Sequence, residues 1–271
     1  MKKLLHLTLA ALLLCGCAKQ AAPSPAESAP SAPTPETNSM SSPAALPDEP
    51  DPAREKFIDV LEGIYFDHVL PDGQQLQLYT EDFNEAPNEF AVFDIDGDGE
   101  DELLVRYITT YTAGMFGAVY GYDRSENRLN VQLMEFPALS FYQNGIVEAG
   151  WSHNQGLAGR FWPCTLYRYD SASDTYFPIA CVDAWDREFF ETDFDGNPFP
   201  EQADPDGENI VYYIYLYAQT EEPAPVSQRD FDTWYHETIG FDPAVHDSSS
   251  FALKIPFLPL TEENILSAFK E

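Results

Sequence analysis

The pattern of apolar and polar positions divides the chain into three segments. Residues 4–14 are mostly apolar and follow two lysines. Residues 18–52 contain no aromatic residue. From residue 53 onward, apolar positions recur with the spacings that are typical of helices and strands. The pattern therefore predicts one folded domain over 53–271.

Within that domain, the pattern predicts helices at both ends and strands between them. Apolar residues recur at three- and four-residue spacing over 53–69, which predicts a helix. From about 88 to 220, aromatic and β-branched runs are separated by Asp, Asn, Ser and Gly, as in the hairpins of one antiparallel sheet. We therefore expect a central antiparallel sheet that follows an N-terminal helix.

Helix-start signals return near the C-terminus. Ser227 and Asp230 have the spacing of a capping box, and an apolar run follows them. Thr261 precedes two glutamates, which suit the positive end of a helix dipole. The order helix, sheet, helices predicts an α+β fold.

Two cysteines fall within the predicted sheet. The turn-like run 170–174 separates two strand patterns, and a regular hairpin around it places Cys164 directly opposite Cys181. Opposed cysteines can form a disulfide where the compartment is oxidising. We expect the Cys164–Cys181 disulfide, with two buried free thiols as the alternative.

The first residues have the layout of a secretory signal peptide, with a short basic region and an apolar region too short to span a bilayer. The end of this region, Leu14-Cys15-Gly16-Cys17, resembles the lipobox of bacterial lipoproteins. The resemblance implies a signal peptide over 1–16 and a lipidated Cys17. It also implies an extracytoplasmic protein of the cell envelope that is anchored to the membrane through Cys17.

Composition favours a tether between the anchor and the domain. Of residues 18–52, most are Pro, Ala or Ser, which cannot build a core. We therefore expect a disordered tether over 17–52, with the lipidated Cys17 at its start.

Charge then limits the partners. The chain has 46 acidic and 14 basic residues, and its net charge is −32. An excess of this size repels nucleic acid and anionic headgroups. We expect no nucleic-acid partner.

One stretch has the pattern of a cation-binding loop. In the run from Phe93 to Val105, carboxylates recur in alternation at Asp94, Asp96 and Asp98, and another follows at Glu102. Calcium takes six to eight oxygen ligands on flexible loops, and glycine permits the sharp turn that such loops need. We expect Ca²⁺ here, held by these carboxylates and by the backbone carbonyl of Glu100.

This loop is similar to the calcium loop of FG-GAP (integrin-type) repeats, in which an Asp-rich, Gly-containing turn precedes a Leu-Leu-Val-like strand. The resemblance implies side-chain ligands at Asp94, Asp96, Asp98 and Glu102, with Glu102 where that family usually has Asp. The domain also resembles uncharacterised lipoproteins of Firmicutes. A weaker echo of the loop lies at 193–201, where Pro198 disfavours the turn and an acidic surface loop is expected.

The sequence favours binding over catalysis. It contains no Gly-x-Ser-x-Gly or His-Glu-x-x-His motif, and no phosphate-binding loop. We expect a calcium-stabilised domain with a glycan or protein ligand. The alternative is a secreted polysaccharide- or cell-wall-acting hydrolase that uses paired carboxylates. For a glycan, the expected stacking platform comes from four tryptophans: Trp151, Trp162, Trp185 and Trp234.

Overall fold

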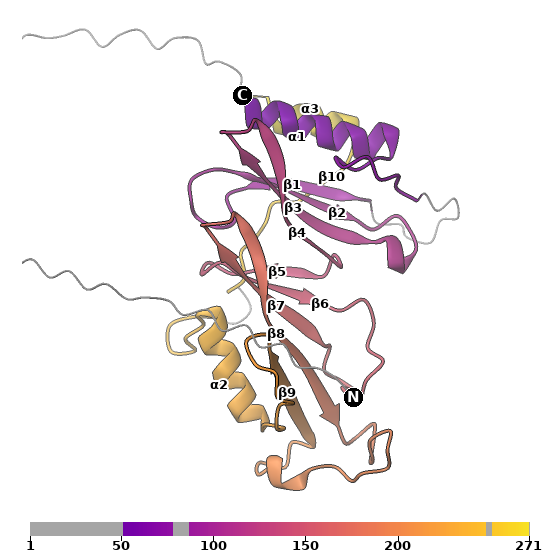
Figure 1. The fold of residues 1–271 in the computed structure, drawn as a ribbon, viewed down its shortest axis with the longest axis vertical. Coiled ribbons are helices and arrows are strands. Elements are labelled where there is room, and N and C mark those ends of the chain that lie inside the picture. Colours follow the sequence, from indigo (N-terminus) through magenta and orange to yellow (C-terminus); the bar gives the residue numbers. More distant parts are fainter. Residues whose placement is uncertain (1–50, 78–86, 248–250, 271) are drawn as a thin grey trace, which may run out of the picture. The chain divides into compact units, whose positions relative to one another are not determined.

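The computed structural model describes residues 51–77, 87–247 and 251–270, and all of them belong to one unit, Pro47–Glu271. The predicted signal peptide, Cys17 and all but the end of the predicted tether lie outside these residues. Two antiparallel sheets and a few helices make up the described part, which is mostly β and fits the α+β class (Figure 1).

The first sheet has the strand order β10-β1-β2-β3-β4. Its strands are β1 (Glu89–Phe93), β2 (Glu102–Tyr107), β3 (Phe116–Asp123), β4 (Arg128–Glu135) and β10 (Leu258–Pro259). Helices α1 (Pro52–Glu62) and α3 (Glu262–Ala268) cover it. The core between them includes Phe57 and Ile265 from the helices and Leu103 and Tyr120 from the strands.

The second sheet has the strand order β5-β6-β7-β8-β9. Its strands are β5 (Leu139–Phe141), β6 (Ile146–Gly150), β7 (Cys164–Asp170), β8 (Thr175–Asp186) and β9 (Ile210–Leu216). Helix α2 (Gln228–Ile239) packs on one face through Phe231, Trp234 and Tyr235. Two 3₁₀ turns, Thr112–Gly114 and Glu201–Ala203, lie in the connections.

The prediction of a single central sheet is therefore wrong. The chain leaves the first sheet after Glu135, and Pro137, which has no backbone N–H to donate, lies in the short crossover to the second. The two sheets share a core that joins Leu104 and Val119 of the first to Val147 and Tyr176 of the second. Strand patterns along a chain do not specify which strands pair, so the division was not visible in them.

Several local predictions are confirmed. Ser227 accepts a hydrogen bond from the backbone N–H of Asp230 at the start of α2, and Thr261 accepts one from Asn264 at the start of α3. The predicted N-terminal helix forms as α1 followed by a π-turn, Gly63–Asp67. It ends at His68, whose backbone is left-handed with a φ of 55°.

The expected pairing of Cys164 with Cys181 is wrong. The hairpin begins in the predicted register, with Asp170 opposite Thr175, but a bulge in β8 near Pro178 shifts the later pairs by one residue. Cys164 therefore lies opposite Val182, and Cys181 lies opposite Thr165. A shift of one residue places two side chains on opposite faces of a sheet. Both cysteines are free thiols in the structure.

A partly buried polar cluster joins α2 to the second sheet. The hydroxyl of Tyr235 donates to Glu148 Oε2 and lies 2.9 Å from the hydroxyl of Tyr142. Burial raises the pKa of Glu148, because the ionised carboxylate loses its hydration, and the Tyr235 bond offsets part of that rise.

This raised pKa predicts a pH dependence of stability. A carboxyl whose pKa is higher in the folded than in the unfolded protein costs stability once the pH rises above its unfolded pKa, about 4.3. We expect the free energy of unfolding of the wild type to fall, relative to that of Glu148→Gln, from this pH up to the folded pKa. Urea titrations of both proteins between about pH 4 and 8 measure the difference. A constant difference across that range would contradict the prediction.

Candidate metal centre

The acidic loop connects the first two strands of the first sheet. Phe93 ends β1, Glu102 begins β2, and these two residues pair across the hairpin. Gly97 and Gly99 have φ values of 81° and 91°, which favour glycine. The predicted strand after the loop is confirmed as β2.

Hydrogen bonds from the backbone hold the loop in a tight turn. Asp94 accepts bonds from Gly97 N at 2.7 Å and from Gly99 N at 3.1 Å, one on each carboxylate oxygen. Asp96 Oδ1 accepts from Asp98 N at 3.0 Å. Because the short acidic side chains satisfy the backbone of their own loop, this sequence folds locally into a cradle of carboxylates.

Three of the predicted ligands converge. Asp94, Asp96 and Glu102 each offer a carboxylate oxygen, and these oxygens lie within 4.8 Å of one another. Glu102 is only 3% exposed, and its Oε2 accepts a hydrogen bond from Ile95 N at 2.9 Å. Asp96 Oδ2 is buried and has no hydrogen-bond partner in the described structure. An acceptor left in this state is costly unless a cation binds it.

The electrostatics of the cluster fit a cation. Burial is the main cause that raises the pKa of Glu102 to about 8, and the nearby Asp96, Asp98 and Asp94 add to it. Burial also raises the pKa of Asp96. Carboxylates held this close repel one another, and a divalent cation between them would remove that repulsion.

The other two predicted residues lie outside the cluster. Asp98 is exposed, and its Oδ1 accepts a hydrogen bond from Glu100 N at 2.8 Å. The carboxylate of Glu100 is held by Arg124 Nε at 2.8 and 2.9 Å. The role expected of Glu100 involves its backbone carbonyl, and this role stays a prediction.

The second sheet supplies a neighbour that sequence reasoning missed. Tyr169 on β7 faces Asp96, and its hydroxyl donates to Asp174 Oδ1 at 2.9 Å. The nearby Tyr169 hydroxyl offsets part of the rise in the pKa of Asp96, although the hydrogen bond that it donates goes to Asp174. Tyr169 lies far from the loop in sequence and on the other sheet, so no spacing signal could have shown it.

The weaker echo at 193–201 behaves as a surface turn. Asp193 Oδ1 accepts hydrogen bonds from Asp195 N at 2.9 Å and from Asn197 N at 2.8 Å. The side chain of Asn197 donates to the other oxygen. These bonds lower the pKa of Asp193. Within the described ranges, no metal-ligating cluster forms at this loop.

The four tryptophans do not form one platform. Trp185 is buried against Phe199, and Trp234 is partly buried in the core under α2. Trp151 and Trp162 are exposed in the connection between β6 and β7 of the second sheet. Of the expected stacking platform, only Trp151 and Trp162 are therefore accessible to a ligand.

Comparison with known proteins finds no relative, so the interpretation of the site rests on its geometry alone. No protein-family model, curated protein or solved structure matches the chain significantly. Among the described residues, no helix combines the length and apolar character needed to cross a bilayer.

Proposed function

We propose that this protein is a lipid-anchored envelope lipoprotein whose extracytoplasmic domain is a binding module stabilised by one Ca²⁺. The observation that carries the calcium assignment is the convergence of Asp94, Asp96 and Glu102, together with the unpartnered buried oxygen of Asp96. In this proposal, the ion bridges the ends of β1 and β2. It replaces the repulsion among the carboxylates by attraction.

The ligand chemistry supports calcium over other divalent cations. All the converging atoms are carboxylate oxygens, which hard cations prefer. Calcium accepts six to eight ligands in irregular geometry, so Asp98, the Glu100 carbonyl and water can complete its shell. Magnesium needs a near-octahedral shell and usually keeps several waters.

The anchor is supported by the lipobox resemblance at Leu14, Gly16 and Cys17, and by the Pro-rich segment that follows. An acylated cysteine with a long tether rich in Pro, Ala and Ser would hold the domain outside the membrane while leaving it free to reach a ligand. The hydrolase alternative stays a prediction.

Calcium is expected to raise the melting temperature of the protein. With a Kd of about 10⁻⁴ M, as in extracellular calcium modules, about 5 mM calcium would add about 2 kcal/mol to the free energy of unfolding. For a domain of this size, that corresponds to a rise of about 4–8 °C. Differential scanning calorimetry of the full chain in detergent, with calcium and with excess EDTA at one pH, measures this shift.

Two variants distinguish calcium binding at this site from a general effect of calcium on an acidic protein. Asp96→Asn should abolish the calcium-dependent shift, because it removes a central ligand charge. Asp193→Asn, in the other acidic loop, should leave the shift unchanged. A melting temperature that ignores calcium in the wild type would refute the proposal, and an equal shift with magnesium would refute the choice of calcium.

A further inference from the structure

We propose that the exposed face of the second sheet is a carbohydrate-binding groove, in which neutral sugar rings stack on Trp151, Tyr215 and Tyr217. This inference rests on the proposed function because it assumes that the domain is a binding module. It adds the class of ligand and the surface that binds it.

The groove lies on the face of the second sheet that α2 does not cover. It is an open pocket of about 450 Å³. Cys181 and Asp183 of β8 form its floor, with Trp151 and residues 215–217 around them. The strand register explains the layout, because Cys181 pairs with Tyr215 and the alternate residue Val182 points to the core under α2. Aromatic rings therefore border a floor that carries a carboxylate.

Hydrogen bonds within the protein hold the tryptophan rings in place. The indole N–H of Trp151 donates to Thr165 Oγ1 at 3.0 Å, and that of Trp162 donates to the carbonyl oxygen of Trp151 at 2.7 Å. Trp151 and Trp162 nevertheless remain 38% and 54% exposed. Because their polar atoms are already bonded, these side chains offer a ligand their aromatic surface.

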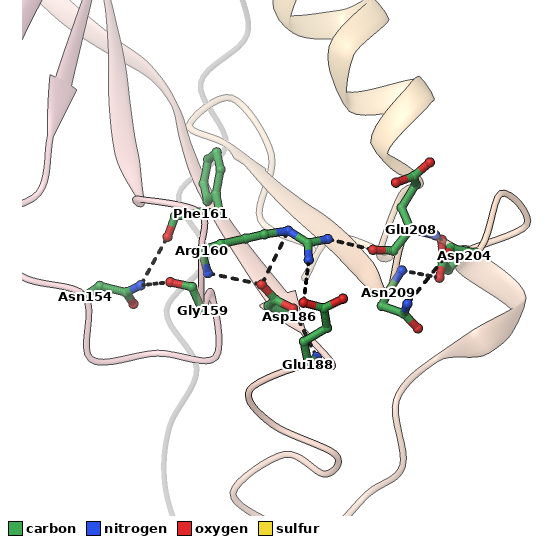
Figure 2. Close-up of polar contacts among 10 residues, drawn as sticks. Asn154, Gly159, Arg160, Phe161, Asp186, Glu188, Asp204, Glu208 and Asn209 are labelled. Atoms are coloured by element: carbon green, nitrogen blue, oxygen red, sulfur yellow. Dashed lines mark hydrogen bonds and ion pairs between the residues drawn. The ribbon is translucent and has the colours of Figure 1, made fainter.

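The segment 151–163 that carries both tryptophans is closed at its neck and pinned to the sheet. Trp151 N donates to the carbonyl oxygen of Pro163 at 2.9 Å, so the ends of the segment meet as in an Ω-loop. Figure 2 shows Asn154 bonded to two carbonyl groups across the loop, and the backbone N–H of Arg160 donating to Asp186. Because segment 151–163 is already ordered before a ligand binds, it loses little conformational entropy on binding.

The loop also comes close to the acidic floor of the groove. A Cβ atom added at Gly156 would lie 3.2 Å from Asp183 Oδ2. Asp183 Oδ1 accepts a hydrogen bond from Ala184 N at 2.8 Å, and burial raises the pKa of Asp183. A partly buried carboxylate at this position can accept hydrogen bonds from a ligand hydroxyl.

This combination favours a neutral carbohydrate. Small-molecule sites are mostly apolar and aromatic, with a few placed polar groups that fix orientation. A sugar ring presents C–H groups to an aromatic face and hydroxyl donors to a carboxylate. The net charge of −32 repels an anionic polymer.

The test is a binding screen on the full chain in detergent, with calcium present. The probes are soluble hexasaccharides of xylose, mannose, N-acetylglucosamine and α- and β-linked glucose. Isothermal titration calorimetry and tryptophan fluorescence measure binding. We expect at least one probe to bind with a Kd below about 1 mM. Trp151→Ala and Tyr217→Ala should each weaken that binding about tenfold or more.

A matched control and a second variant keep the test decisive. Phe66 is exposed on the turn after α1, outside the groove, so Phe66→Ala should bind like the wild type. Because the Trp151 side chain also donates a hydrogen bond to Thr165 on β7, its removal can disturb the fold, and Tyr217→Ala with a wild-type melting temperature is the deciding variant. The absence of binding to every probe would overturn the inference, as would binding that survives Tyr217→Ala.

The same samples distinguish this inference from the proposed calcium centre. If calcium raises the melting temperature while no probe binds, the groove assignment fails and the metal centre stands. If a probe binds while the melting temperature ignores calcium, the metal centre fails and the groove assignment stands.

Discussion

Replacing Asp186 with alanine is expected to lower the free energy of unfolding by about 3–5 kcal/mol, because it leaves two backbone N–H groups unsatisfied at a cost of about 1–3 kcal/mol each. Asp186 is fully buried at the end of β8, and it accepts hydrogen bonds from the backbone N–H groups of Arg160 and Glu188, both at 3.1 Å (Figure 2). Arg160 Nε lies 3.6 Å from its carboxylate. The variant leaves the two N–H groups without an acceptor and removes the carboxylate that pairs with the guanidinium.

Chemical denaturation measures this loss, and the melting temperature should fall by about 6–20 °C. Glu188→Ala is the matched control, because Glu188 contacts the same guanidinium at 3.2 Å but its side chain is 58% exposed. An exposed ion pair contributes about 0–1 kcal/mol, so this variant should be nearly neutral. Equal losses in the two variants would show that burial does not govern the network.

The network has a consequence for the groove. Asp186 accepts from the loop at Arg160, and its own N–H donates to the carbonyl oxygen of Leu157 at 2.8 Å. The side chain at 186 therefore helps to hold the segment that carries both exposed tryptophans. Asp186→Ala should weaken oligosaccharide binding as well as the fold.

Replacing Phe231 with alanine is the second substitution with a large expected effect, about 3–5 kcal/mol. Phe231 anchors α2 to the second sheet, and its ring stacks on Tyr212 with centroids 4.2 Å apart and an interplanar angle of 6°. It also meets Phe161 edge-on at 5.7 Å. Truncation would leave a cavity among large rings, which cannot close around the loss.

Urea titration of Phe231→Ala measures this cost, with Thr233→Ala as the control. Thr233 lies on the exposed side of α2, and its hydroxyl donates only to the carbonyl oxygen of Arg229 in its own helix. Its truncation should change stability by less than about 0.5 kcal/mol. A comparably small effect at Phe231 would mean that the helix is held mainly by other contacts.

Local sequence patterns predicted the structure most accurately at the helix starts and at the turns. Ser227 and Thr261 begin their helices as the spacing predicts, since an N-cap depends on atoms three residues away. The turn at 170–174 also forms as predicted. The pairing beyond it does not, because one extra residue in β8 places Cys181 on the face of the sheet opposite to that of Cys164. Pro178 was the available signal, since proline within a paired strand is typical of a bulge.

The candidate metal site also has some features that local sequence predicts and others that depend on the tertiary structure. The spacing of acids and glycines determined a tight acidic turn before a strand, because that turn is closed by bonds within a few residues. Only the tertiary structure decided that Glu102 is buried and that Asp98 and Glu100 stay outside the cluster. Burial and the approach of Tyr169 depend on the second sheet, whose packing against the first is not encoded in any local spacing.

The sequence by itself determined the helix starts, the strand-rich middle and the acidic turn, since each depends on neighbours along the chain. The tertiary structure decided which strands pair, which cysteine faces which side, and which tryptophans remain exposed. These outcomes depend on contacts between residues that are distant in the chain. The energy of such contacts exists only once the two sheets have formed and packed together.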